Sequence, residues 1–111
     1  MAPVLNRRLV LEEARRAPDG AGGGAVSWEA LGAIWASVRA SSGREVEVGE
    51  RKRSRVTHRI LVRAAPVGAP QRPRADQRFR EGARLFRIRA VSEADPRGRL
   101  LTCWAYEEAE A

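Results

Sequence analysis

The chain has 111 residues, a formal net charge of +7, and charged side chains at 32% of its positions. This length fits a single domain, residues 1–111, with one modest core and little room for a substrate cleft. All of the basic residues except Lys52 are Arg, and they are spread along the chain. The charge allows two interpretations: binding to nucleic acid or an acidic partner, or a bias in the coding sequence.

The single cysteine, Cys103, excludes an internal disulfide and fits a reducing compartment. Its neighbours Leu101 and Trp104 predict a buried strand thiol and not a reactive one. Residues 1–8 lack the apolar core of a signal peptide, and no stretch approaches the ~20 apolar residues of a membrane span. We expect a soluble chain that is not exported and has no membrane partner.

The first strand is predicted over residues 5–13, where Leu9 and Leu11 share one face. Residues 17–24 follow with Pro-Asp-Gly and further glycines, which predicts a hairpin tip. A phosphate-binding loop is the alternative, but the Lys-Ser/Thr that would complete it is absent.

Residues 26–40 form the second predicted strand region. Helical spacing of Trp28, Leu31 and Trp35 also permits a short helix over residues 28–36. The β-branched and aromatic residues concentrate at 34–39, so we favour a strand there.

Residues 41–54 break the alternating pattern and predict a long polar loop. Ser42 and Glu45 have capping-box spacing, which allows a helical turn. The basic run at residues 50–55 matches a weak nuclear-localisation pattern, for which a solvated loop is the simpler interpretation. Long loops in compact domains are usually functional or disordered.

The second half of the chain predicts several short strands. In residues 55–63, Val56, His58, Ile60 and Val62 face one way and alternate with Thr57, Arg59, Leu61 and Arg63. Proline excludes a central strand in the connection at residues 64–76. The remaining expectations are a short edge piece at 77–80, strands at 84–91 and 99–106, turns at 81–82 and 93–98, and an acidic tail at 107–111. Five or six strands result, which favours a small, mainly β fold: an antiparallel β-barrel or sandwich with one long loop between the second and third strands.

No catalytic or metal-binding constellation accompanies these strands. His58 is the only histidine and lies on an apolar face, so we expect it to pack in the core and not to bind metal. We predict no enzyme activity and no cofactor. The tryptophans Trp28, Trp35 and Trp104 are expected to be core or interface anchors, with base stacking as the alternative.

Four arginines alternate along two predicted strands and would line one face of a sheet. Such a face could meet phosphates, or acidic surfaces of a neighbouring subunit. The interface candidates are Arg59, Arg63, Arg87 and Arg89.

The order of short segments resembles the phage head–tail joining proteins, also called stopper or head-completion proteins, including those of gene transfer agents. The segments that carry the resemblance are Leu5-Asn6-Arg7-Arg8-Leu9-Val10-Leu11, Pro18-Asp19-Gly20-Ala21-Gly22-Gly23, Trp28, Ile34-Trp35-Ala36-Ser37-Val38, Ser42-Gly43-Arg44-Glu45, His58-Arg59-Ile60 and Phe86-Arg87-Ile88-Arg89-Ala90-Val91. They cover most of the chain, and the connection at residues 64–80 is longer and richer in Pro and Arg than is usual for the family.

The resemblance implies a structural subunit of a virion or phage-like particle, assembled in the bacterial cytoplasm. It implies a hexameric or dodecameric ring at the head–tail junction, with an adaptor protein on the portal side and a tail terminator or tail tube protein on the other. Double-stranded DNA would occupy the channel, and the ring would help retain it and provide the tail platform. A small basic nucleic-acid-binding barrel is the alternative. The loop implied to close the channel comprises Gly43, Arg44, Glu45, Val46, Glu47, Val48, Gly49, Glu50, Arg51, Lys52 and Arg53.

Overall fold

The computed structural model describes residues 4–18, 24–41, 44–48 and 51–108. Within these residues the chain forms strands and no helix. The eight strands are β1 Arg7–Pro18, β2 Gly24–Ala40, β3 Arg44–Val48, β4 Arg51–Arg55, β5 Thr57–Arg63, β6 Arg78–Glu81, β7 Arg84–Glu93 and β8 Leu100–Glu108.

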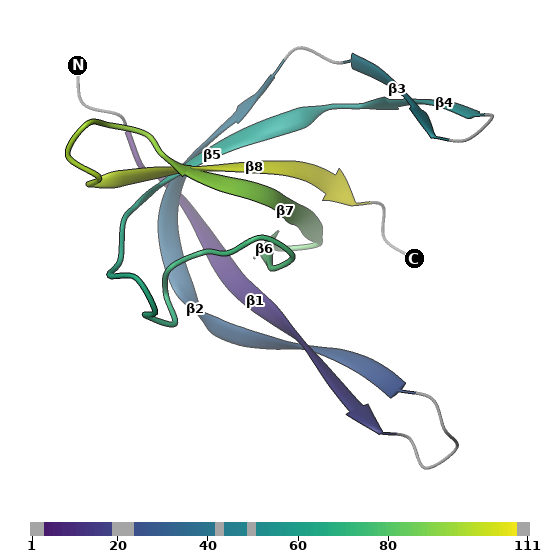
Figure 1. Ribbon diagram of the computed structural model, residues 1–111, viewed down its shortest axis with the longest axis horizontal. Coiled ribbons are helices and arrows are strands. Elements are labelled where there is room, and N and C mark those ends of the chain that lie inside the picture. The colour runs from purple at the N-terminus through teal and green to yellow at the C-terminus, as the bar shows by residue number, and fades with distance from the viewer. Residues whose placement is uncertain (1–3, 19–23, 42–43, 49–50, 109–111) are drawn as a thin grey trace.

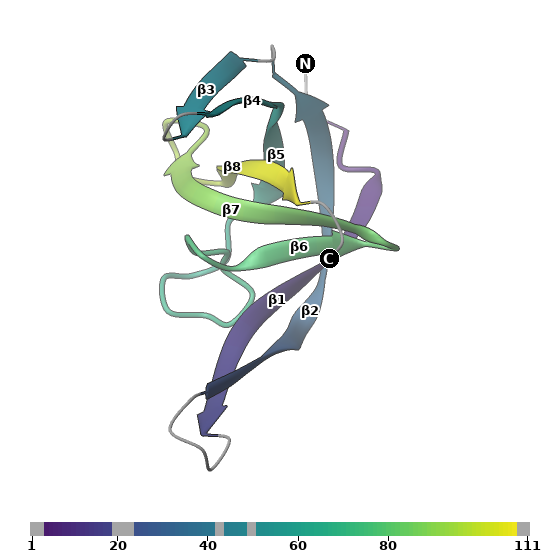
Figure 2. The ribbon, with the colours of Figure 1, turned by 90° about the vertical axis from the view of Figure 1, so that its right-hand side faces the viewer.

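Six of these strands close into one antiparallel barrel in the order β1-β2-β5-β8-β7-β6 (Figure 1). The predicted mainly β, antiparallel fold is therefore confirmed. β3 and β4 form a separate two-stranded sheet, which lies at the top of Figures 1 and 2. The distal part of the β1–β2 hairpin leaves the barrel at the bottom of both views, so two ribbons project from opposite sides.

The core forms because alternate residues of each barrel strand point inward. Leu9 and Leu11, predicted to share one face of the first strand, are both buried, and so are His58, Ile60 and Val62 of β5. The strands β7, β8 and β6 add Phe86, Ile88, Leu101, Cys103, Ala105 and Phe79. Val56, predicted to share the inward face of β5, lies before that strand and is exposed. The buried apolar cluster consists of Leu9, Leu11, Ala36, Ile60, Val62, Phe79, Phe86, Ile88, Leu101, Cys103 and Ala105.

The second predicted strand region is a strand throughout, so the alternative helix over residues 28–36 does not form. Pro18 pairs with Gly24, which makes β1 and β2 a hairpin, while its predicted tip at residues 19–23 lies outside the described residues. A β-bulge places Leu31 between two consecutive pairs, Leu11 with Gly32 and Glu12 with Ala30. Gly32 has a φ of 143°, which a side chain would oppose.

The long connection between β2 and β5 lies where the sequence placed it, but it is not irregular. β3 and β4 pair from Arg44 with Arg55 to Val48 with Arg51. Glu45 belongs to a strand, so the helical turn that its capping-box spacing allowed does not form. The alternating Val and Glu at residues 45–48 fit this strand better than a helix.

β6 was predicted as an edge piece, and this is wrong. It pairs with β7 on one side and with β1 on the other, through Val10, Leu11 and Glu12. β6 is therefore the strand that closes the barrel. The polar and Pro-rich residues before β6 gave no indication of this role. Closure of the barrel depends on pairing with residues 66 or more positions away in the chain, which a local sequence pattern does not show.

No strand lies between Arg63 and Arg78, and turns hold this Pro-rich connection in place. The amide of Arg72 donates to the carbonyl of Ala69 at 3.0 Å, and its guanidinium donates to the carbonyl of Ala65 at 2.8 Å. At the other end of the chain, Glu107 and Glu108 of the expected acidic tail belong to β8, and residues 109–111 lie outside the described part.

Candidate interaction surfaces

Three of the four predicted interface arginines surround two aromatic side chains of β8. Arg59 lies opposite Trp104, with its guanidinium carbon 5.6 Å from the indole centroid. Arg87 lies opposite Tyr106, and the Arg89 guanidinium is 5.6 Å from the same phenol ring. Arg59 and Arg89 therefore lie over the aromatic rings of β8, whereas the guanidinium of Arg87 lies over Trp28.

The four arginines differ in how available they are. Arg87 is half-buried, and its guanidinium lies 3.6 Å from Glu108 and 5.1 Å from the Trp28 ring. Arg59, Arg63 and Arg89 are exposed and form no ion pair with any residue that the structure describes. Arg63 lies opposite Leu100, away from the aromatic pair. Arg87 thus serves the chain's own packing, whereas the other three face solvent.

Sequence reasoning missed two further members of this surface. Arg39 of β2 lies directly opposite Arg59, and Arg8 of β1 lies directly opposite Trp35. Trp35 is 57% exposed, so it is not a core residue, which was one of the two roles expected for it. The sequence did contain an indication of this surface: Trp35 and Arg39 have the same parity along β2, so they lie on the face opposite to that of the buried Ala36. We call the set formed by Arg8, Trp35, Arg39, Arg59, Arg63 and Trp104 the Arg–Trp face.

A second cluster joins the strands that close the barrel. Glu12 is buried, and its carboxylate accepts a hydrogen bond from Arg78 Nε at 2.7 Å and lies 3.0 Å from Arg80 Nε. The Arg78 guanidinium also stacks over Trp28 at 4.0 Å, and Arg87 covers Trp28 at 5.1 Å. Trp28 is therefore an anchor of the fold, held between two cations.

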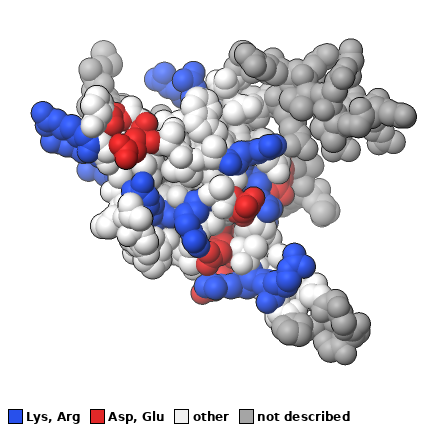
Figure 3. Space-filling model, in the orientation of Figure 1, with Lys and Arg blue, Asp and Glu red and all other residues white. Residues whose placement is uncertain are grey.

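Ion pairs engage most of the described carboxylates. Arg84 binds Glu107 through two hydrogen bonds, of 2.8 and 3.1 Å, and Arg7 donates two to Glu81. These hydrogen bonds from arginine lower the pKa of Glu107 and of Glu81. Figure 3 shows basic and acidic side chains side by side over the middle of this view.

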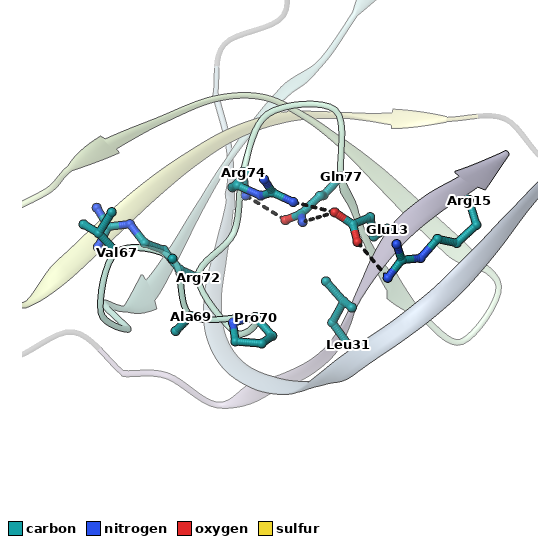
Figure 4. Close-up of a pocket in the computed structure, with 10 residues that line it drawn as sticks. Glu13, Arg15, Leu31, Val67, Ala69, Pro70, Arg72, Arg74 and Gln77 are labelled. Atoms are coloured by element: carbon teal, nitrogen blue, oxygen red, sulfur yellow. Dashed lines mark hydrogen bonds and ion pairs between the residues drawn. The ribbon is translucent and has the colours of Figure 1, made fainter.

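A hollow of about 450 Å³ lies between the β1–β2 hairpin and the Pro-rich connection (Figure 4). Leu31 and Glu13 are among the residues that line it, and the Glu13 carboxylate is bound by Arg74 at 2.5 Å and by Gln77 at 3.4 Å. Arg15 approaches the same carboxylate at 3.3 Å. Arg15, Arg74 and Gln77 therefore fix the position of the Glu13 carboxylate at the hollow.

The two residues most able to support catalysis are buried in the core, as predicted. His58 is 7% exposed and packs edge-on against Phe86 with ring centroids 5.1 Å apart. Burial raises the pKa of Cys103 to about 12, which keeps its thiol protonated and unreactive. Across the described residues, no three His, Cys, Asp or Glu side chains cluster as metal ligands would. Nor does that part of the chain contain a helix suited to crossing a bilayer.

The predicted channel loop corresponds to the β3–β4 hairpin. Its residues 44–48 and 51–53 lie in the two strands, and Gly43, Gly49 and Glu50 lie outside the described residues. The hairpin stands clear of the barrel in Figures 1 and 2. Its role in a channel stays a prediction at this point.

The described residues thus form a closed barrel with an exposed Arg–Trp face and a projecting hairpin. The chain matches the phage head completion protein family over residues 1–109, and it belongs to that family. It is therefore a structural component of a virion or phage-like particle.

Solved structures that resemble the chain include the following two. One is a chain in the virion of a native gene transfer agent particle, with 55% identity and a TM-score of 0.83 over 99% of this chain and 100% of that chain. The other is a Shigella flexneri 2a protein solved in solution, with 24% identity and a TM-score of 0.66 over 96% of each chain, which shares the fold. No curated protein matches the chain.

Proposed function

We propose that the protein forms a ring at the head–tail junction, helps to close the DNA channel with its β3–β4 hairpin, and provides the platform on which the tail is attached. The single observation that carries this proposal is that the hairpin is a sheet of its own outside the closed barrel. A projecting hairpin can change position without breaking any barrel pairing, and this is what a channel gate requires.

The dimensions of the hairpin suit this role. A five-residue strand spans about 17 Å, so hairpins from several subunits could meet on the axis of a ring. Residues 44–55 carry five basic and three acidic side chains, which gives them attraction for packaged DNA. A head-to-tail arrangement of identical subunits would close the ring, with an adaptor on the head side and a tail protein on the other.

The test replaces Arg44–Arg53 by a short Gly/Ser linker. The barrel should retain its denaturation midpoint, because β3 and β4 pair only with each other. Particles that carry the variant should lose packaged DNA, measured as protection of the DNA from added nuclease. A matched control replaces residues 67–71 of the Pro-rich connection by a linker of the same composition, and we expect full protection.

Two results would contradict the proposal. Equal DNA retention by the hairpin variant and the parent would remove the gating role. Tight, salt-dependent binding of free duplex DNA by the isolated chain, together with normal particles in its absence, would favour the alternative of a nucleic-acid-binding barrel.

A further inference from the structure

The Arg–Trp face concentrates positive charge that the chain does not neutralise. Arg8, Arg39, Arg59 and Arg63 are exposed on adjacent strands, and the strand register places no Asp or Glu between them. Arg39 and Arg59 lie directly opposite each other, and like charges in such a cross-strand pair are destabilising. This surface combines unpaired arginines with the exposed Trp35. Arg and Trp are enriched in protein interfaces relative to the rest of the protein surface, so the composition is that of an interface.

A second copy of the chain is a poor occupant for this face. Among the carboxylates whose side chains the structure describes, which leaves out those of residues 42–55, Asp76, Glu93 and Asp95 have no Arg partner. Asp95 is already used, since its Oδ1 accepts hydrogen bonds from the backbone amides of Arg99 and Leu100 at 2.8 and 3.2 Å. The chain as a whole carries +7, so a homotypic contact here would add repulsion.

Double-stranded DNA fits this face less well than protein does. Aromatic side chains bind nucleic acid by stacking on unpaired bases, and a duplex does not present them. Trp35 is the more exposed of the two tryptophans of this face, and against duplex DNA it would have no unpaired base on which to stack. Against a protein, an exposed Trp beside guanidinium groups can fill a pocket while the arginines bind carboxylates in a bidentate manner.

We infer that the Arg–Trp face is the docking surface for a different protein of the particle, one that presents a carboxylate-rich segment around an apolar pocket for Trp35. This inference rests on the proposed role as a connector, and it names the surface and the chemistry of one partner. It does not involve the β3–β4 hairpin.

The first experiment reverses the charge of the face. The double variant Arg39→Glu, Arg59→Glu keeps the cross-strand repulsion, because both members of the pair change together. Its matched control, Arg97→Glu with Arg99→Glu, alters the net charge equally at exposed positions beside the β7–β8 turn. We expect incorporation into particles, measured by quantitative mass spectrometry, to fall at least tenfold for the first variant and less than twofold for the control.

The second experiment identifies the occupant by photo-crosslinking in assembled particles. The substitution Ser37→benzoylphenylalanine puts the probe on the same face, between Trp35 and Arg39 along β2. A crosslink to an acidic segment of another particle protein supports the inference. A crosslink to DNA, a crosslink to the same chain, or no crosslink with Trp35 still open to oxidation in the particle would overturn it.

The two proposals fail in different ways. If the docking inference is wrong, the Arg39 and Arg59 variant enters particles normally. If the gating proposal is wrong, the hairpin variant enters particles and retains DNA. Incorporation and nuclease protection are separate readouts, so either proposal can be rejected while the other stands.

Discussion

The barrel closes between β1 and β6 through three backbone residue pairs and the buried carboxylate of Glu12. We call this junction the barrel seam, and Glu12 is the position at which its contribution to stability is best tested. Its side chain is 5% exposed, and the side chains of its partners Arg78 and Arg80 are 15% and 46% exposed. The substitution Glu12→Gln keeps the shape but removes the charge. Two guanidinium groups then lose their counter-ion next to a closed core.

The expected loss follows from the burial of the three groups. Removing one partner of a fully buried ion pair costs about 3–5 kcal/mol. Arg80 is close to solvent, and the amide oxygen of Gln can still accept one hydrogen bond, so we expect about 2–3 kcal/mol. With a urea dependence of roughly 1–1.5 kcal/mol per molar, the midpoint of unfolding should fall by about 2 M.

Equilibrium urea unfolding followed by tryptophan fluorescence measures this shift. The control is Glu29→Gln, which breaks an ion pair of 2.5 Å to Arg15 on the exposed part of the β1–β2 hairpin. That pair is accessible to water and salt, so the control should leave the midpoint unchanged. An equal midpoint for the Glu12 variant and the control would refute the reasoning that the seam depends on this carboxylate.

Three further predictions follow from burial and ion pairing. Phe86→Ala should destabilise the fold by about 3–5 kcal/mol, because Phe86 is fully buried in the core. Trp35→Ala should leave the urea midpoint nearly unchanged, because the Trp35 side chain is exposed. Cys103, with its pKa raised to about 12, should resist a thiol reagent at pH 8 until denaturant is added, and its contribution to stability should disappear as the pH rises from about 9 through 12. The lowered pKa values of Glu81 and Glu107 stabilise the fold above about pH 4.5, and this contribution should fade at lower pH; a flatter midpoint-against-pH curve for the corresponding Gln variants would verify it.

Local pattern predicted the elements well where apolar and polar residues alternate. The inward faces of β1, β5, β7 and β8 could be read from residues such as Leu9, Ile60 and Phe86, because side chains of a strand point to opposite faces in turn. The turn chemistry before Gly24 predicted the first hairpin for a similar local reason. Segments with few apolar residues were harder, and the β3–β4 hairpin was expected to be a loop.

What the sequence by itself determined about this protein is the position of the strands in which apolar and polar residues alternate, most of the core, and a family resemblance carried by the order of short motifs. Tertiary structure alone decided the rest, since pairing partners lie far apart in the chain. It made β6 the closing strand, engaged Arg87 with Glu108, and left Trp35 exposed beside Arg8. The sequence does not show which arginines have a carboxylate beside them in the folded chain. Only the fold determines which arginines form an ion pair within the chain and which remain available to bind a partner.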